Sequence, residues 1–243
     1  MKVKSVIHRL NKSAADSFLG LGMWLVKSVI ASNSGKYFSY QPMPWIGYPG
    51  KRRAESTYLR LEAMKPHMPP PPASILDIGC NTGYNLISFA KAGYSAFGID
   101  VEPRFKLIFD YAIHKSATQK AAMMVDRIDP LTISSLPKTD VVILQSVYHH
   151  WCSAYGISNA QAMLAEVWDK TGSVLFFEGG EDKEAALGVD GDLRKWNKDQ
   201  LQSACRGGEI VEVIETLKRE DKNNSSTRML YKVKRQLSIL PIQ

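Results

Sequence analysis

The sequence predicts an α/β protein with a doubly wound, mostly parallel sheet of seven strands that ends in an antiparallel strand. Short apolar strands alternate with helical segments from residue 74 to residue 205, which is the order of a parallel sheet with helices on both faces. Residues 209–217 and 227–233 then alternate in polarity with no helix between them, as in an antiparallel pair. With 243 residues, 44% of them hydrophobic, the chain can bury a full core, which excludes a wholly disordered protein.

The predicted elements follow one another regularly along the chain. The clearest strand is residues 140–145, because four consecutive apolar residues are typical of a strand that is buried on both faces. Pro103 opens one helix, in the first turn where proline is favoured. The other parallel strands are expected at residues 74–78, 96–99, 121–125 and 173–177. The helices are expected at residues 54–64, 82–92, 103–116, 158–169 and 194–205.

Four consecutive prolines at residues 69–72 divide the chain into an N-terminal extension and a main domain. Proline cannot continue a helix and favours an extended backbone, so these residues predict a stiff connector. We therefore expect a basic, mainly helical extension over residues 1–68 and a domain over residues 69–235. Residues 236–243 are expected to form a C-terminal tail.

The positive charge of the chain is concentrated in the extension. The net charge is +7, and residues 1–65 hold 11 of the 31 basic residues but only three of the 24 acidic ones. The main domain is near neutral and gives no electrostatic reason to expect nucleic acid. An anionic partner, such as RNA or a membrane surface, is expected to meet the extension. The apolar residues 18–30 suit an interfacial helix at a membrane or, alternatively, a helix packed over the domain as a lid.

Cysteine usage and hydropathy limit the setting in which the protein works. The three cysteines, Cys80, Cys152 and Cys205, form no CxxC pair, so neither a disulfide scaffold nor a cysteine-rich zinc site is expected. No apolar run reaches the ~18–20 residues that span a bilayer. We expect a cytoplasmic protein, with peripheral contact to the inner membrane face as the variant that residues 18–30 allow.

The most informative segment is residues 75–83, ILDIGCNTG, which joins the first strand to the following helix. Glycines in such a turn let the backbone approach a ligand closely and adopt positive φ. The second strand ends in Asp100, and a carboxylate there can accept hydrogen bonds from both hydroxyls of a ribose. The two features predict a site for a nucleoside-containing cofactor.

The spacing of the glycines narrows the kind of cofactor. Gly79 and Gly83 are separated by three residues, which does not fit the dinucleotide fingerprint G-x-G-x-x-G. The segment resembles instead the first motif, D-x-G-x-G-x-G, of the class I S-adenosylmethionine-dependent methyltransferases, which are Rossmann-like enzymes. Asp77, Gly79 and Gly83 match this motif, and Asn81 replaces the middle glycine. Asparagine tolerates left-handed backbone angles better than most residues, so the departure is mild.

The resemblance covers about residues 70–235 and implies S-adenosyl-L-methionine as the cofactor. It implies that Asp77 and Gly79 lie against the methionine end and that Asp100 holds the ribose. It also implies that Asp126, just after the third strand, meets the adenine amino group. The residues expected at the cofactor are Asp77, Gly79, Cys80, Asn81, Gly83, Asp100, Asp126 and Gln145.

The end of the fourth strand, residues 145–151 (QSVYHHW), faces the methyl acceptor in this family. A neutral imidazole suits the removal of a proton from the acceptor, so His149 or His150 is the expected base. Tyr148, Trp151 and Glu178 are expected to line the acceptor site. A metal is not expected, because Gln145 closes the fourth strand where a metal-dependent relative carries acidic ligands.

Residues 41–49, QPMPWIGYP, resemble a segment that precedes the core domain in methyltransferases associated with bacterial cell-surface glycans. The resemblance implies a metal-independent methyltransferase that acts on a small molecule or a glycan, at oxygen. One alternative is a tRNA-modifying methyl- or carboxymethyltransferase whose basic extension binds phosphates. Another is a non-catalytic cofactor-binding or scaffold protein of the same fold.

Overall fold

The structure is a computed structural model, and it describes residues 21, 22, 24, 28, 41–50, 54–180, 188–189, 191–221 and 224–236. The four described residues within the predicted segment 18–30 are helical, and among them Leu21 and Trp24 expose their side chains. The rest of that segment lies outside the described residues, and so do residues 237–243 of the predicted tail. Within the described part of the chain, no helix has the length and apolar character that crossing a membrane requires.

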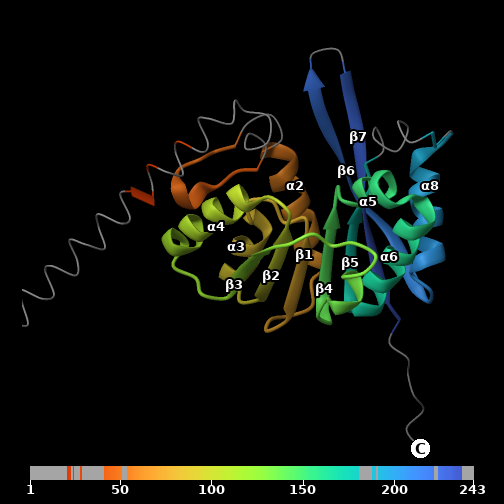
Figure 1. Cartoon of the computed structure of the whole chain (residues 1–243), viewed down its shortest axis with the longest axis horizontal. Helices are drawn as coiled ribbons and strands as arrows, with labels where there is room; N and C mark the ends of the chain where they lie inside the picture. The colour runs from red at the N-terminus through yellow and green to blue at the C-terminus, as the bar shows by residue number, and fades with distance from the viewer. Residues whose placement is uncertain are drawn as a thin grey trace, which may run out of the picture.

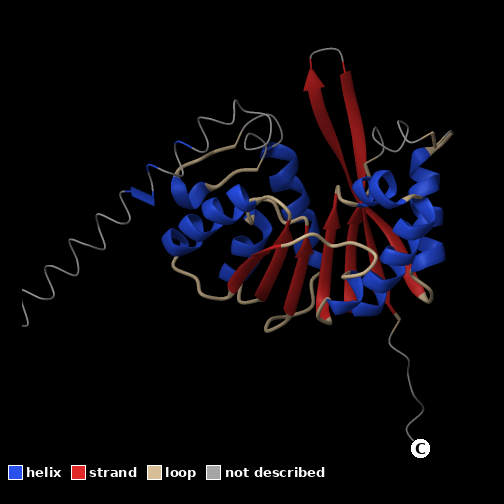
Figure 2. Ribbon diagram, in the orientation of Figure 1, coloured by secondary structure: helices blue, strands red, loops and turns tan. Residues whose placement is uncertain are grey.

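Seven strands form one sheet, as the sequence predicts (Figure 1 and Figure 2). Their order across the sheet is β3-β2-β1-β4-β5-β7-β6. Strands β1 to β5 are parallel to one another, and β7 is antiparallel to both β5 and β6. The strands are β1 (Ser74–Ile78), β2 (Ser95–Asp100), β3 (Ala121–Val125), β4 (Thr139–Gln145), β5 (Thr171–Glu178), β6 (Gly208–Asp221) and β7 (Asn224–Arg235).

The strand order reverses between β1 and β4, which lie side by side although β2 and β3 come between them in the sequence. Helices that follow β1 and β4 leave toward opposite faces of the sheet, so the carboxyl ends of these two strands border a crevice where ligands bind in open α/β sheets. The hairpin of β6 and β7 extends beyond this edge of the sheet (Figure 1). The fold thus predicts a ligand site at the carboxyl ends of β1 and β4.

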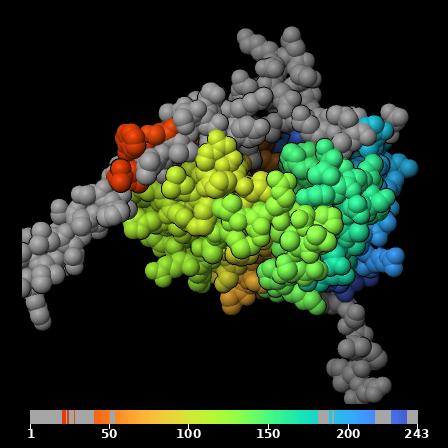
Figure 3. Space-filling model, viewed as in Figure 1, coloured from red at the N-terminus to blue at the C-terminus, as the bar shows by residue number. Residues whose placement is uncertain are grey.

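Helices cover both faces of the sheet. On one face α2 (Ala54–Met64), α3 (Tyr84–Lys91) and α4 (Pro103–Ser116) enclose one part of the core. On the other face α5 (Tyr148–Tyr155), α6 (Ile157–Lys170) and α8 (Leu193–Ala204) enclose the second part. The space-filling view shows the yellow-green residues around position 110 on one side of the molecule and the green to blue residues from about position 150 onward on the other (Figure 3).

The helix predicted at residues 82–92 begins only at Tyr84, because the residues before it continue the turn and Gly83 has a φ of 82°. The sequence prediction misses α5 altogether. Its sequence, YHHWCSAY, contains few strong helix formers. The helix is stabilised by burial of Tyr148, Trp151 and Cys152, which lie at the i, i+3, i+4 spacing of one face.

The described part of the N-terminal extension packs on the main domain. Met43, Leu61 and Met64 are buried in the same cluster as side chains of α3 and α4. The rings of Trp45 and Tyr58 lie 5.7 Å and 5.5 Å from the ring of Tyr84, the first residue of α3. The segment therefore lies beside the turn that the sequence predicts for the cofactor.

Candidate active site

The predicted site residues meet at the carboxyl edge of the sheet. In the parallel register Asp77 pairs with Gly98, Ile78 with Leu144, and Gln145 with Glu178. The ends of β1, β2, β4 and β5 are thereby level with one another, although they are separated by up to 100 positions in the sequence. Side chains that follow or end these strands therefore lie together at one edge of the sheet.

The turn between β1 and α3 is built from left-handed residues. Gly79, Asn81 and Gly83 have φ values of 76°, 52° and 82°, so Asn81 takes the conformation for which a glycine is usual at its position. A Cβ atom on Gly79 would lie 2.3 Å from Cγ2 of Val147, and one on Gly83 would lie 2.4 Å from the Phe109 ring. Neighbouring side chains thus pack directly on the bare backbone, and the turn is fixed in shape.

Asp100, at the end of β2, is buried and joins that strand to the turn. Its Oδ2 accepts a hydrogen bond of 2.8 Å from the amide of Asn81, and its Oδ1 accepts one of 3.0 Å from the amide of Glu102. Burial raises the pKa of the carboxyl above its ordinary value, and the backbone hydrogen bonds oppose this shift. Asp126 lies next to Asp100, because the amide of Asp126 donates to the carbonyl of Asp100. The side chain of Asp126 is exposed.

Asp77 is the second buried carboxyl of the site. Nδ2 of Asn85 lies 3.3 Å from its Oδ2 and 3.4 Å from Oε1 of Gln145, which links the ends of β1 and β4. Burial raises the pKa of Asp77 to about 7, the hydrogen bond from Asn85 opposes the shift, and the charge of Asp100 adds to it. Cys80 is also buried here, and its thiol has a pKa raised well above the ordinary value by the same burial.

The raised pKa of Asp77 makes a prediction for stability. In the folded protein Asp77 loses its proton near pH 7, whereas in the unfolded chain it loses it near pH 4. The stability that comes from protonated Asp77 is therefore fully present below pH 4 and is lost as the pH rises through 7. Asp77→Asn removes the titration. We expect the free energy of unfolding of the variant to rise relative to that of the unaltered protein between pH 4 and pH 7, by up to about 1.4 kcal/mol per pH unit, with a matching rise in relative melting temperature. Calorimetric melts across this range check it, and a difference that does not change with pH would contradict it.

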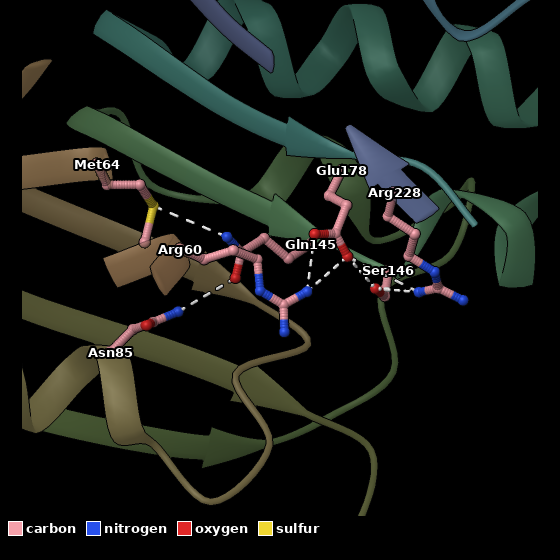
Figure 4. Close-up of polar contacts among 7 residues, drawn as sticks. All are labelled: Arg60, Met64, Asn85, Gln145, Ser146, Glu178 and Arg228. Atoms are coloured by element: carbon pink, nitrogen blue, oxygen red, sulfur yellow. Dashed lines mark hydrogen bonds and ion pairs between the residues drawn. The ribbon is translucent and has the colours of Figure 1, made fainter. Parts of the chain in front are cut away.

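Glu178, at the end of β5, lies in a buried charge network (Figure 4). Nη1 of Arg60, from α2, is 2.7 Å from both carboxylate oxygens, and the hydroxyl of Ser146 donates to Oε1 at 2.8 Å. Nη1 of Arg228, from β7, lies 3.8 Å from the same carboxylate and donates to the Ser146 hydroxyl at 2.6 Å. The exposed fractions of the side chains are 0% for Glu178, 12% for Arg60 and 6% for Arg228, so water screens these charges little.

The network keeps Glu178 ionised. Burial alone would raise its pKa, but the charges of Arg60 and Arg228 and the hydrogen bonds to its oxygens outweigh burial, and the pKa lies below the ordinary value. The sequence gives no sign of this network, because 118 positions separate Arg60 from its partner and nothing local distinguishes it from other arginines. Arg60, Arg228, Ser146 and Asn85 are therefore site residues that the sequence prediction misses.

The side chains after β4 divide between the core and the site. Tyr148 is fully buried, with its hydroxyl 3.0 Å from Oε1 of Gln200 and its ring against Phe177, and Trp151 is buried in the same cluster. His149 is buried and His150 exposed, with ring centroids 4.1 Å apart. That Tyr148 and Trp151 shape an acceptor pocket stays a prediction, since both pack into the core here.

The arrangement fits a nucleoside-containing cofactor with positive charge. The turn presents bare backbone, Asp100 offers carboxylate oxygens at the end of β2, and Asp77 lies buried at the end of β1. Among the described residues, no three His, Cys, Asp or Glu side chains are grouped so as to hold a metal ion.

Comparison with known proteins agrees with this geometry. A family model described as a methyltransferase domain matches residues 76–176. The chain is 28% identical over 106 residues to the O-antigen chain terminator bifunctional methyltransferase/kinase WbdD of Escherichia coli. That match covers 43% of this chain and 15% of the relative.

Solved structures show the same fold. WbdD superposes with a TM-score of 0.66 at 20% identity, over 86% of this chain and 45% of that chain. Magnesium protoporphyrin IX methyltransferase (ChlM) from Synechocystis PCC 6803, with bound S-adenosylmethionine, superposes with a TM-score of 0.56 at 15% identity, over 75% of this chain and 79% of that one. The chain spans less than half the length of the WbdD proteins that it matches. The matched domain runs from β1 to β5 and so contains the turn and the strands at whose carboxyl ends this site lies, which supports the resemblance to the class I S-adenosylmethionine-dependent methyltransferases.

Proposed function

We propose that the protein transfers a methyl group from S-adenosylmethionine to an oxygen atom of a glycan or of a small molecule, without a metal. The observation that supports this most is the pairing of a cofactor turn at β1 and β2 with a histidine pair beyond β4, at one edge of the sheet. The relative WbdD is named for terminating O-antigen chains, which favours a glycan. The amide of Gln145 at the end of β4 and the use of Glu178 by two arginines leave few acids for a metal.

The chain's own residues have three tasks in this reaction. When bound, the cofactor would supply a methyl group that is activated by its positively charged sulfur, with a neutral thioether as the leaving group. Asp100 and the turn would hold the nucleoside and so orient the methyl group toward the acceptor oxygen. His149 or His150 takes the proton that the hydroxyl loses, and the buried surroundings of His149 exclude water from that step.

Transfer of labelled methyl groups tests this proposal. The protein is incubated with methyl-labelled S-adenosylmethionine and, in separate reactions, oligosaccharides, small hydroxyl compounds and transfer RNA, each with and without a chelator. We expect label in an oligosaccharide or small molecule, at an unchanged rate with the chelator. Label in transfer RNA would favour the rival enzyme, and tight cofactor binding with no transfer to any acceptor would favour a non-catalytic protein.

The two histidines can be separated by substitution. We expect replacement of the base by glutamine to lower kcat by a factor of about 10²–10⁴, since that is the usual contribution of a positioned general base. His149→Gln and His150→Gln are compared on the acceptor found above, with His114→Gln on α4 as the control. Both variants keeping full kcat would show that neither histidine is the base.

A further inference from the structure

The turn between β4 and α5 has an unusual backbone that the charge network holds. Ser146 has a φ of 57°, a left-handed conformation that serine seldom adopts. Its amide donates to the carbonyl of Glu178 at 2.9 Å, and its hydroxyl donates to Oε1 of the same residue at 2.8 Å. Arg228 donates to that hydroxyl at 2.6 Å. The turn therefore takes its shape from Glu178, which Arg60 in turn holds with both carboxylate oxygens.

This turn also touches the cofactor site. Val147 follows Ser146, and its Cγ2 occupies the space that a Cβ atom on Gly79 would need. The first turn of α5 then carries His149. A displaced Ser146 turn would thus move Val147 against the cofactor turn and His149 with it.

A second connection runs along the chain from Glu178 to His149. Gly180 lies two residues beyond Glu178, and a Cβ atom on it would lie 2.2 Å from Nδ1 of His149. The imidazole therefore packs directly on the backbone of Gly180. The position of His149 therefore depends on two segments that leave the network, the one that runs from Glu178 to Gly180 and the one that runs from Ser146 into α5.

We propose that Arg60 and Arg228 are positioning residues for methyl transfer. By holding Glu178, they set the Ser146 turn and so place His149 relative to the cofactor turn. Neither guanidinium acts on the reacting atoms. Arg60 belongs to α2, so this helix of the extension takes part in arranging the acceptor side of the site. The inference rests on the proposed function, in that the histidine pair serves the acceptor.

Kinetics of Arg60 variants test the role in transfer. For Arg60→Met we expect kcat to fall roughly tenfold or more, with the KM for S-adenosylmethionine within about threefold, because misplacement of a catalytic group costs rate rather than cofactor binding. The acid limb of the pH profile of kcat should move to higher pH. Without the positive charge of Arg60 the pKa of Glu178 rises, so the network loses its carboxylate at a higher pH. Arg60→Lys should recover part of the rate, because it keeps the charge without the forked geometry.

The control is Lys106→Met, which removes a basic side chain from an exposed ion pair with Asp110 on α4. It should leave kcat and the pH profile unchanged. If Arg60→Met lowers the melting temperature but leaves kcat and the acid limb where they are, Arg60 is merely structural and the proposal is wrong.

A second measurement is independent of turnover. NMR resonances of the imidazole carbons are recorded with S-adenosylhomocysteine bound, and the His149 signal is assigned by its loss in His149→Gln. We expect this signal to shift in Arg60→Met and in Glu178→Gln, and to stay in place in Lys106→Met. An unmoved His149 signal would overturn the positioning role even if transfer is observed. If the unaltered protein transfers no methyl group, the proposed function fails, and this comparison still decides whether Arg60 and Glu178 position His149.

Discussion

Replacement of Glu178 by alanine is expected to destabilise the protein by about 3–5 kcal/mol, because it leaves two nearly buried guanidinium groups without their carboxylate. The loss is electrostatic in origin, since a buried charge cannot recover the hydration that it gives up on folding. Urea unfolding followed by circular dichroism measures the change in the free energy of unfolding. A loss this large is comparable to much of the stability of an ordinary domain.

Two companion variants separate the causes. Glu178→Gln keeps the shape of the side chain and one accepting oxygen but removes the charge, so a loss of similar size would show that the ionised carboxylate is what matters. Glu62→Ala removes an acid from α2 whose pair with Lys65 is half exposed or more on both sides, and it should change stability little. A Glu178→Ala protein as stable as the Glu62→Ala protein would contradict the buried network.

Asp100→Ala is expected to weaken S-adenosylmethionine binding roughly 100-fold. Each hydrogen bond to a charged group contributes about 1.5–3 kcal/mol, and the carboxylate can accept from two ribose hydroxyls. The same side chain holds the amide of Asn81, so its loss also loosens the turn that approaches the cofactor. Isothermal titration calorimetry with S-adenosylmethionine and with S-adenosylhomocysteine measures the affinity directly.

The two ligands make the result more specific. Both contain the ribose, so both should lose affinity by a similar factor, whereas a defect at the sulfonium would affect only the charged one. Asp110→Ala, on the exposed surface of α4, provides the matched control and should bind as the unaltered protein does. Affinity that stays within about threefold in Asp100→Ala would show that the ribose is held elsewhere.

The cofactor side of the site is predictable from sequence because its geometry is local. Gly79, Asn81 and Gly83 stand within five positions, and each has the left-handed backbone that its residue type suggests. Asp100 is found because a strand of clear hydropathy ends in it. The seven strands are predictable for the same reason, since each carries its apolar pattern within a few residues.

The acceptor side is less predictable because long-range contacts determine it. Helix α5 forms through the burial of its aromatic side chains, which its weak helix propensity does not reveal. Arg60 and Arg228 reach Glu178 from α2 and β7, which lie far apart in the sequence. Single-sequence patterns carry no information on such pairs, so two charged residues of the site are found only once the sheet is assembled.

The ion pair between α2 and β5 also has a consequence for the order of folding. Arg60 is synthesised 118 residues before Glu178. The guanidinium on α2 therefore has no carboxylate to pair with until nearly the whole parallel sheet has been synthesised. Contacts of such sequence separation form late, because the intervening chain must first be ordered. We therefore expect α2 to be among the last elements to dock on the sheet. A chain truncated at the prolines would have to form its sheet without that helix.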